Sequence, residues 1–278
     1  MRMFNYERLS DDIKIAVSSD HTFGTDAVIL SDFAKIKPRD KALDMGTGCG
    51  IIPLLWLRNE KINNVFCLDI QKNAYEQVCH SIEINHLEDR LKPFNCDLRK
   101  INEIFYSLQG EGYHTGTPAV FIRFSGCNLK CSFCDTRHEE GVLMSDDEII
   151  AEVGKYPAVT VILTGGEPSL WIDEAFIDRL HQAGKYVCIE TNGTNPLPPN
   201  IDWVTCSPKQ GVKLGITRMD EVKVVYEGQD IGVYELLPAE YFFLQPCSCS
   251  NTAETVACVM QHPKWRLSLQ THKLIDIR

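Results

Sequence analysis

The chain has 278 residues, and its 28 basic and 38 acidic side chains give a net charge of -10. Phosphate backbones are held by clustered Lys and Arg, so this balance argues against a nucleic-acid-binding surface and favours small-molecule work. A hydrophobic content of 44% is ordinary for a soluble protein of one large or two small domains. There is no apolar run of about eighteen residues, and the charged start MRMFNYERLSDD does not resemble a signal peptide. We therefore expect a cytoplasmic protein that binds neither membranes nor nucleic acid.

The first hundred residues predict an incomplete Rossmann-like βαβαβ segment. Hydrophobic patterning gives strands at 41–44, 64–69 and 91–96, and helices from residue 51 and over 71–85. The loop Gly46-Thr47-Gly48-Cys49-Gly50 follows the first strand, and Asp69 ends the second. Glycines that allow close approach, followed by an acid that can take ribose hydroxyls, are typical of a nucleotide site. By itself, a GxGxG pattern of this kind is a weak signal.

The segment DMGTGCGIIPLL, with GTDAVILSDFA before it, resembles Rossmann-type S-adenosylmethionine methyltransferases, in particular those that methylate N6 of adenine in a valine tRNA. That family places an Asn-Pro-Pro-Tyr catalytic motif after the next strand. Here Cys96-Asp97 leads directly into Ile101-Asn102-Glu103. Half a sheet also leaves a strand edge unpaired and an apolar face uncovered. We predict that residues 1–98 are a truncated, non-catalytic methyltransferase-like segment.

Residues 99–278 predict a second α/β unit, in which strands and helices alternate. Roughly 180 residues are too few for a complete eight-stranded barrel of about 250, so we expect a partial (β/α) barrel. A capping box, Ser145-Asp146-Asp147-Glu148, opens one helix. The expected strands are 101–109, 119–126, 159–166, 186–193, 203–208, 221–227 and 241–246, and further helices are expected at 172–183 and 251–261.

Three of the twelve cysteines form a compact set in Cys127-Asn-Leu-Lys-Cys131-Ser-Phe-Cys134. Cytosolic thiols stay reduced, so a ligand role is favoured over disulfides. Three thiolates suit an iron-sulfur cube with one iron left open, whereas a closed zinc site needs a fourth ligand. Zinc with His138 as that fourth ligand is the alternative. Cys67 and Cys188 read as buried thiols, and Cys247 and Cys249 are unassigned.

The C-x3-C-x2-C pattern, with Phe133 before the last cysteine, resembles the radical S-adenosylmethionine superfamily, and TGGEP at 164–168 resembles its second motif. Further motifs stand in the order found in the 7-carboxy-7-deazaguanine synthase family, which this part of the chain closely resembles. They are LQGEG at 108–112, Arg123, Cys134-Asp135-Thr136, Ser207-Pro208-Lys209 and WRLSLQTHK at 265–273. The resemblance implies a partial radical-SAM barrel that converts 6-carboxy-5,6,7,8-tetrahydropterin to 7-carboxy-7-deazaguanine with loss of ammonia, on the route to queuosine.

The resemblance also implies the site residues and cofactors. The cofactors are a [4Fe-4S] cluster, S-adenosylmethionine and Mg²⁺. Substrate contacts are Leu108, Gln109, Gly110, Arg123 and Thr164; S-adenosylmethionine contacts are Phe133, Cys134, Asp135, Gly166, Ser207, Pro208 and Lys209; cluster ligands are Cys127, Cys131 and Cys134, and Thr136 holds Mg²⁺. A carboxylated substrate is best bound by a cation that donates two hydrogen bonds, and Arg123 can supply one. The alternative role for Arg123 is a surface salt bridge. A turn cap is the alternative role for Thr136. Glu190-Thr191-Asn192-Gly193 is left outside the predicted site.

The expected partners are the pterin, an electron donor such as flavodoxin or ferredoxin, and a second copy in a homodimer. Two other functions remain as alternatives. A glycyl-radical activating enzyme shares the three cysteines but does not require LQGEG and QTHK. A tRNA-binding methyltransferase or adaptor would need a basic face, which the net charge opposes.

Overall fold

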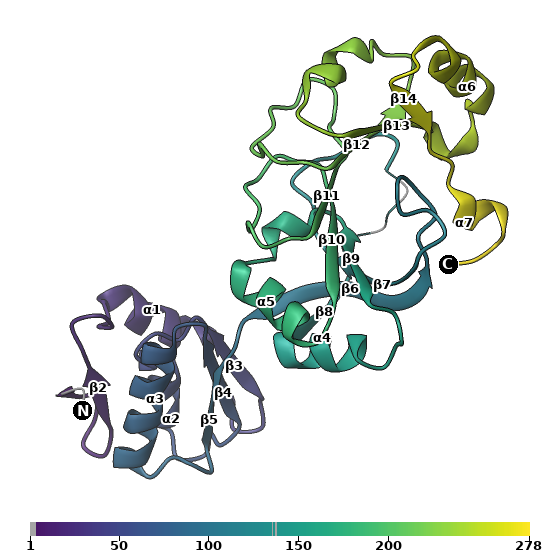
Figure 1. The fold of residues 1–278 in the computed structure, drawn as a ribbon. Coiled ribbons are helices and arrows are strands. Elements are labelled where there is room, and N and C mark those ends of the chain that lie inside the picture. Colours follow the sequence, from purple (N-terminus) through teal and green to yellow (C-terminus); the bar gives the residue numbers. More distant parts are fainter. Residues whose placement is uncertain (1–3, 135, 137) are drawn as a thin grey trace. The chain divides into compact units, whose positions relative to one another are not determined.

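The computed structural model describes residues 4–134, 136 and 138–278, and the chain divides into two compact units, Met1–Asp97 and Leu98–Arg278 (Figure 1). The division lies one residue before the expected position, because Leu98 already pairs with Ser145 in the sheet of the second unit. Within the described ranges, no helix combines the length and apolarity needed to cross a membrane.

The first unit contains an antiparallel hairpin and a three-stranded parallel sheet of order β3-β4-β5. One helix follows the hairpin, and the elements after that helix have the expected β-α-β-α-β order. The methyltransferase origin stays a prediction. The elements are β1 (Asn5–Arg8), β2 (Lys14–Val17), α1 (Thr25–Ala34), β3 (Ala42–Met45), α2 (Ile51–Leu57), β4 (Val65–Asp69), α3 (Lys72–Asn85) and β5 (Leu91–Asn95).

One face of the three-stranded sheet is covered and the other is not. Val65 and Cys67 of β4 are buried in a core with Leu54 of α2 and Val78 of α3. On the opposite face, the exposed apolar side chains are those of Leu43, Met45 and Phe94. The uncovered face expected for half a sheet is therefore present.

Asp69, the last residue of β4, holds the glycine loop that follows β3. Gly46, Gly48 and Gly50 all have positive φ, which L side chains rarely adopt. Asp69 accepts hydrogen bonds from the backbone amides of Gly48 (2.8 Å) and Gln71 (2.9 Å), one on each carboxylate oxygen. One oxygen of the predicted ribose acceptor thus holds the glycine loop, and the other holds the first residue before α3.

The second unit is built on a nine-stranded sheet of order β14-β13-β12-β11-β10-β9-β7-β6-β8. Strands β7 and β9 to β14 are parallel, and β6 pairs antiparallel with both β7 and β8. The elements are β6 (Leu98–Leu108), β7 (Pro118–Phe124), β8 (Val142–Ser145), α4 (Asp146–Val153), β9 (Thr160–Gly165), η1 (Pro168–Leu170), α5 (Glu174–Gln182), β10 (Tyr186–Thr191), β11 (Trp203–Cys206), β12 (Glu221–Tyr226), η2 (Gly232–Leu236), β13 (Tyr241–Pro246), η3 (Cys247–Cys249), α6 (Thr252–Gln261), β14 (Trp265–Leu267) and α7 (Thr271–Leu274).

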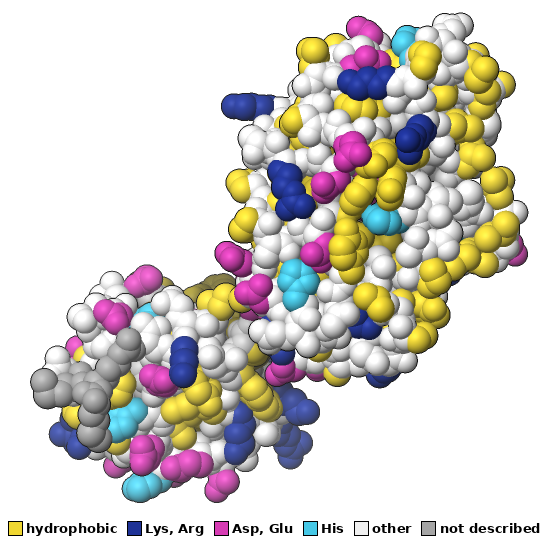
Figure 2. Space-filling view, in the orientation of Figure 1, with side chains coloured by type: hydrophobic (Ala, Val, Ile, Leu, Met, Phe, Trp, Pro, Cys, Tyr) yellow, Lys and Arg dark blue, Asp and Glu magenta, His cyan; other side chains and the backbone are white. Residues whose placement is uncertain are grey.

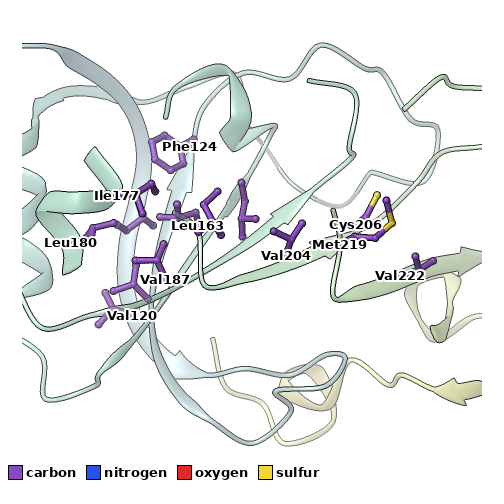
Figure 3. Close-up of a cluster of buried hydrophobic side chains, with 14 of the residues drawn as sticks. Val120, Phe124, Leu163, Ile177, Leu180, Val187, Val204, Cys206, Met219 and Val222 are labelled. Carbon is purple, nitrogen blue, oxygen red and sulfur yellow. The ribbon is translucent and has the colours of Figure 1, made fainter. Parts of the chain in front are cut away.

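Helices α4 and α5 pack against one face of the sheet and form its main core. Ile177 and Leu180 of α5 lie against Val120, Leu163 and Val187 of the strands (Figure 3). The predicted capping box is confirmed, since the Ser145 hydroxyl accepts from the Glu148 amide and the Glu148 carboxylate accepts from the Ser145 amide. The short strands β8 and β14 were not anticipated from the sequence.

The opposite face of the sheet curves around a cavity. Residues of β6, near one edge of the sheet, and of β13, near the other edge, line this same cavity. The sheet is open, with β8 and β14 as its edges. On the visible face of this unit, Lys and Arg are scattered among other residues instead of forming one patch (Figure 2).

Candidate active site

A cavity of about 550 Å³ opens at the carboxyl ends of the parallel strands. Polar groups commonly gather there because the loops after neighbouring parallel strands meet at one edge. The predicted residues that line it are Leu108, Gln109, Gly110, Arg123, Cys127, Cys131, Phe133, Cys134, Thr136, Thr164, Gly166, Ser207 and Lys209. Motifs that are more than a hundred residues apart in the chain therefore share one site.

The three cysteines follow β7 in a loop without regular structure, and all line the cavity. Cys127 and Cys131 are partly buried, and Cys134 is exposed. Among the described residues, no three His, Cys, Asp or Glu side chains form a ready-made metal site. The donor set nevertheless fits a [4Fe-4S] cluster, since three thiols face the cavity together, while the alternative zinc ligand His138 does not line it.

The TGGEP segment holds the start of this cysteine loop. The Gly166 amide donates to the carbonyl of Phe124 (3.0 Å), and the Glu167 amide donates to that of Gly126 (2.9 Å). A Cβ on Gly166 would overlap the carbonyl oxygen of Gly126, so only glycine permits this approach. The fully buried Glu167 carboxylate accepts from the Thr191 hydroxyl and the Asn192 amide, both at 2.7 Å. Glu167 thus joins the ends of β9 and β10 behind the loop.

A ring of amide and hydroxyl groups fixes the cysteine loop from the side of β10. The Asn192 side chain donates to Asn128 Oδ1 (2.9 Å) and accepts from the Thr194 hydroxyl (2.7 Å). The Asn128 side chain closes the ring by donating to Thr194 Oγ1 (2.8 Å). Asn128 directly follows Cys127, so this ring gives the previously unassigned TNGT segment a positioning role.

Replacing Asn192 by alanine should therefore weaken iron retention about tenfold, as loss of outer-shell partners typically does. The measurement is the loss of iron from anaerobically reconstituted protein to a chelator. Asn200→Ala is the matched control, because the Asn200 amide donates to the Glu174 carbonyl at α5 (3.0 Å) and does not line the cavity. Equal iron retention by Asn192→Ala and wild type would contradict this role.

A buried charge network occupies the floor of the cavity. The Lys223 ammonium, on β12, pairs with Glu111 (2.6 Å) and Glu190 (2.8 Å), and its side chain is 7% exposed. Glu190 also accepts from Gln109 Nε2 (3.1 Å) and the Thr164 hydroxyl (3.0 Å). Burial alone would raise the Glu190 pKa, but attraction to Lys223 outweighs it and holds that pKa well below its ordinary value. Both carboxylates are therefore held beside a fixed cation.

Sequence reasoning missed this network, although a signal was present. Glu221 and Lys223 interrupt the otherwise apolar strand EVKVVY at alternate positions, which places both on the same face of β12. Glu190 ends its strand in the ETNG segment that was left out of the predicted site. Gln270, from the QTHK segment, donates to Glu111 (2.8 Å) and completes the network.

Arg123, on β7, faces the cavity with a carboxylate beside it. Its Nε donates to Glu103 Oε1 of β6 (2.8 Å), and both side chains are 24% exposed. Among the described residues, no acceptor is recorded for the two Nη groups of Arg123, which therefore remain available to a ligand. The salt bridge and the binding role that were alternatives in the sequence can thus coexist.

The Ser207-Pro208-Lys209 turn presents its two polar members to the cavity. The Lys209 ammonium donates to the carbonyl (2.8 Å) and hydroxyl (2.7 Å) of Ser207 and lies 5.7 Å from the centre of the Phe133 ring. Burial lowers the pKa of Lys209. Pro208 lies between the two and does not line the cavity.

The QTHK segment forms the wall beside the LQGEG loop. The Thr271 amide donates to the Gly110 carbonyl (2.9 Å), and a Cβ on Gly110 would overlap the His272 ring. Glycine is therefore needed for this close approach. Of the other predicted or unassigned residues, Asp135 lies outside the described residues and Cys247 lines the cavity. The side chain of Cys249 is also outside the description.

Glu221, below this network, gives a pH-dependent prediction. Burial raises its pKa to about 7, and its Oε1 has no hydrogen-bond partner within the described part of the chain. The pKa of Glu221 is higher in the folded protein than in the unfolded chain. The stability that this difference contributes is fully present at a pH below the unfolded-state pKa, and it is lost as the pH rises through about 7. Glu221→Gln should therefore gain stability relative to wild type between pH 5 and 8, by about 3 kcal/mol. Urea unfolding at the two pH values measures this; a constant difference would contradict it.

Comparison with known proteins decides the family. Residues 121–204 match the model of the radical SAM superfamily. A 7-carboxy-7-deazaguanine synthase of Bacteroides thetaiotaomicron is 90% identical over 181 residues, which are 65% of this chain and 100% of that protein. The chain belongs to the 7-carboxy-7-deazaguanine synthase family.

Other members of the 7-carboxy-7-deazaguanine synthase family agree. The synthase of Burkholderia multivorans is 42% identical over 205 residues, covering 64% of this chain and 98% of its own length. The crystal structure of QueE from Escherichia coli matches 62% of this chain and 93% of its own, with a TM-score of 0.54 and 31% identity. The large, mostly parallel sheet is consistent with that fold. As a radical SAM enzyme, the chain requires a [4Fe-4S] cluster and S-adenosylmethionine.

Proposed function

We propose that the second unit converts 6-carboxy-5,6,7,8-tetrahydropterin to 7-carboxy-7-deazaguanine with loss of ammonia, in queuosine biosynthesis. The observation that carries this proposal is one cavity that combines three thiols, a guanidinium with unused donors and a buried network of charged groups. A polar heterocycle with a carboxylate needs both kinds of group, because its ring edge and its charge are recognised separately.

The substrate contacts follow from the chemistry of the lining. The Nη groups of Arg123 are suited to the carboxylate, in a bidentate arrangement. Gln109, Thr164 and the backbone of Leu108 and Gly110 bound the ring. Glu190 and Glu111, each paired with Lys223, present acceptors to the amino and amide hydrogens of a pterin. Groups that hydrogen bonds hold in place would thus orient the bound substrate before it reacts.

The cofactor contacts occupy the other side of the cavity. Cys127, Cys131 and Cys134 would hold the cluster. Contacts to S-adenosylmethionine are assigned to Phe133, Cys134, Gly166, Ser207 and Lys209, with Asp135 and Pro208 assigned on the family resemblance. When bound, the cluster and S-adenosylmethionine supply the radical that starts the reaction, and the protein orients the reactants and excludes water. Thr136 lines the cavity, and its hydroxyl would serve as a hard ligand for Mg²⁺.

The proposal extends to the partners and the cell compartment. A flavodoxin or ferredoxin would deliver the electron, and the synthase would act as a cytoplasmic homodimer. Residues 1–98 would take no part in the reaction. Sedimentation of the anaerobic protein would test the dimer.

The test of the function is anaerobic reconstitution with iron and sulfide, followed by dithionite, S-adenosylmethionine and the carboxylated tetrahydropterin. We expect the 7-deazapurine and ammonia in equal amounts, without net consumption of S-adenosylmethionine. A protein with a well-formed cluster that yields neither the 7-deazapurine nor 5'-deoxyadenosine would contradict the proposal.

A further inference from the structure

A second guanidinium shares the carboxylate that pairs with Arg123. Glu103 Oε1 accepts from Arg123 Nε (2.8 Å), and Glu103 Oε2 accepts from Arg278 Nη2. Both guanidinium groups lie over the Phe105 ring, with their carbon atoms 5.6 Å and 5.1 Å from its centre. The Ser107 hydroxyl also donates to the Arg278 carbonyl, so two residues of β6 hold Arg278 in place. All of Glu103, Phe105, Arg123 and Arg278 line the cavity.

The charges of this triad do not cancel. Two guanidinium groups surround one carboxylate, so these three side chains together carry a net charge of +1. Without Arg278, Glu103 would neutralise Arg123. The substrate carboxylate would then meet an Arg123–Glu103 pair with no net charge and would be repelled by the Glu103 carboxylate. Arg123 and Glu103 are each 24% exposed, whereas the side chain of Arg278 is 69% exposed, so solvent screens part of this difference.

We propose that Arg278 is a positioning and specificity residue for the carboxylated substrate. By holding one oxygen of Glu103, Arg278 keeps the positive charge of Arg123 available to the substrate carboxylate. This inference rests on the proposed function, since it assumes that Arg123 receives that carboxylate. It adds that preference for the carboxylated pterin depends on a residue that need not touch it.

The proposal makes a signed prediction for two substitutions together. Arg278→Gln removes the second cation and leaves Glu103 to neutralise Arg123, so carboxylate binding should weaken. Adding Glu103→Gln removes the neutralising charge as well and returns the net charge to +1. The double variant should therefore bind the carboxylate better than Arg278→Gln alone. A purely structural role for Arg278 predicts no recovery, because the second substitution removes a further contact.

The experiment measures binding of 6-carboxypterin and of unsubstituted pterin to the reconstituted full chain, with S-adenosylmethionine and without reductant. We expect Arg278→Gln to weaken binding of 6-carboxypterin about fivefold and to leave binding of pterin within about twofold. Glu103→Gln/Arg278→Gln should regain most of the loss. The matched control is Arg266→Gln, an exposed arginine outside the cavity that lies over Tyr241.

Two results would overturn the inference while leaving the proposed function intact. One is unchanged discrimination in Arg278→Gln, and the other is a double variant no better than Arg278→Gln. If the wild type itself did not prefer 6-carboxypterin to pterin, the carboxylated substrate would be contradicted first, and the role of Arg278 with it.

Discussion

Lys223→Met is expected to destabilise the second unit by about 3–5 kcal/mol and to lower synthase activity by at least about a hundredfold. The substitution keeps much of the side-chain volume but leaves Glu111 and Glu190 together in the cavity without their shared cation. Burial alone would lower the pKa of Lys223, but attraction to these carboxylates outweighs it and raises that pKa above its ordinary value. Urea unfolding of the protein and the rate of 7-deazapurine formation are the measurements.

The matched control is Lys155→Met, which breaks an exposed pair with Glu152 in the same unit. Surface pairs of this kind contribute little, so unfolding and activity should stay at the wild-type values. Adding Glu190→Gln to Lys223→Met removes one uncompensated charge and should recover part of the stability but not the activity. Wild-type stability in Lys223→Met would show that water or another group already compensates the two carboxylates.

The cysteine loop illustrates what sequence spacing can predict. Three thiols within eight residues, placed directly after an apolar strand, must lie on one loop whatever the rest of the chain does. The TGGEP segment ends a strand adjacent to β7 in the sheet, so its amides reach the carbonyls of Phe124 and Gly126. The local sequence pattern and the adjacency of the two strands were sufficient to predict that these segments meet, because each contact is made by the backbone at a strand end.

The charge network illustrates what spacing could not predict. Glu111, Glu190 and Lys223 come from three elements, and their meeting depends on the order of strands and on the register of β12. A one-residue shift in that register would turn Lys223 to the opposite face. The charged residues of EVKVVY indicated an unusual strand, but the sequence held no information on which carboxylates would surround the lysine.

Pairing with an edge strand likewise limited how accurately the domain boundary could be predicted from the sequence. The predicted strand began at Ile101, whereas β6 begins at Leu98, because its first residues pair with the unanticipated β8. Arg99, 1% exposed, lies inside this extension. It pairs with Asp146 (2.7 Å) and Asp173 (3.4 Å) at the starts of α4 and α5, and lies 4.2 Å from the centre of the Phe176 ring. A partner so distant in sequence gives no local signal.

A chain that begins at Leu98 is therefore expected to keep full synthase activity, and one that begins at Ile101 is expected to lose it. The first retains the whole of β6 and has 181 residues, the length over which the Bacteroides thetaiotaomicron synthase matches. The second lacks Arg99, which leaves Asp146 and Asp173 without their buried cation at a cost of about 3–5 kcal/mol. That is a large part of the total stability of a domain, about 5–15 kcal/mol.

Thermal unfolding and 7-deazapurine formation by the two shortened chains measure this difference. Arg99→Met in the full chain separates the ion pairs from the strand, because it keeps β6 and β8 paired while removing the cation. It should unfold at a lower temperature than the chain that begins at Leu98, even though it retains all 278 residues. A substantial loss of activity on removing residues 1–97 would instead show that the first unit contributes to the reaction, against the non-catalytic role predicted for it.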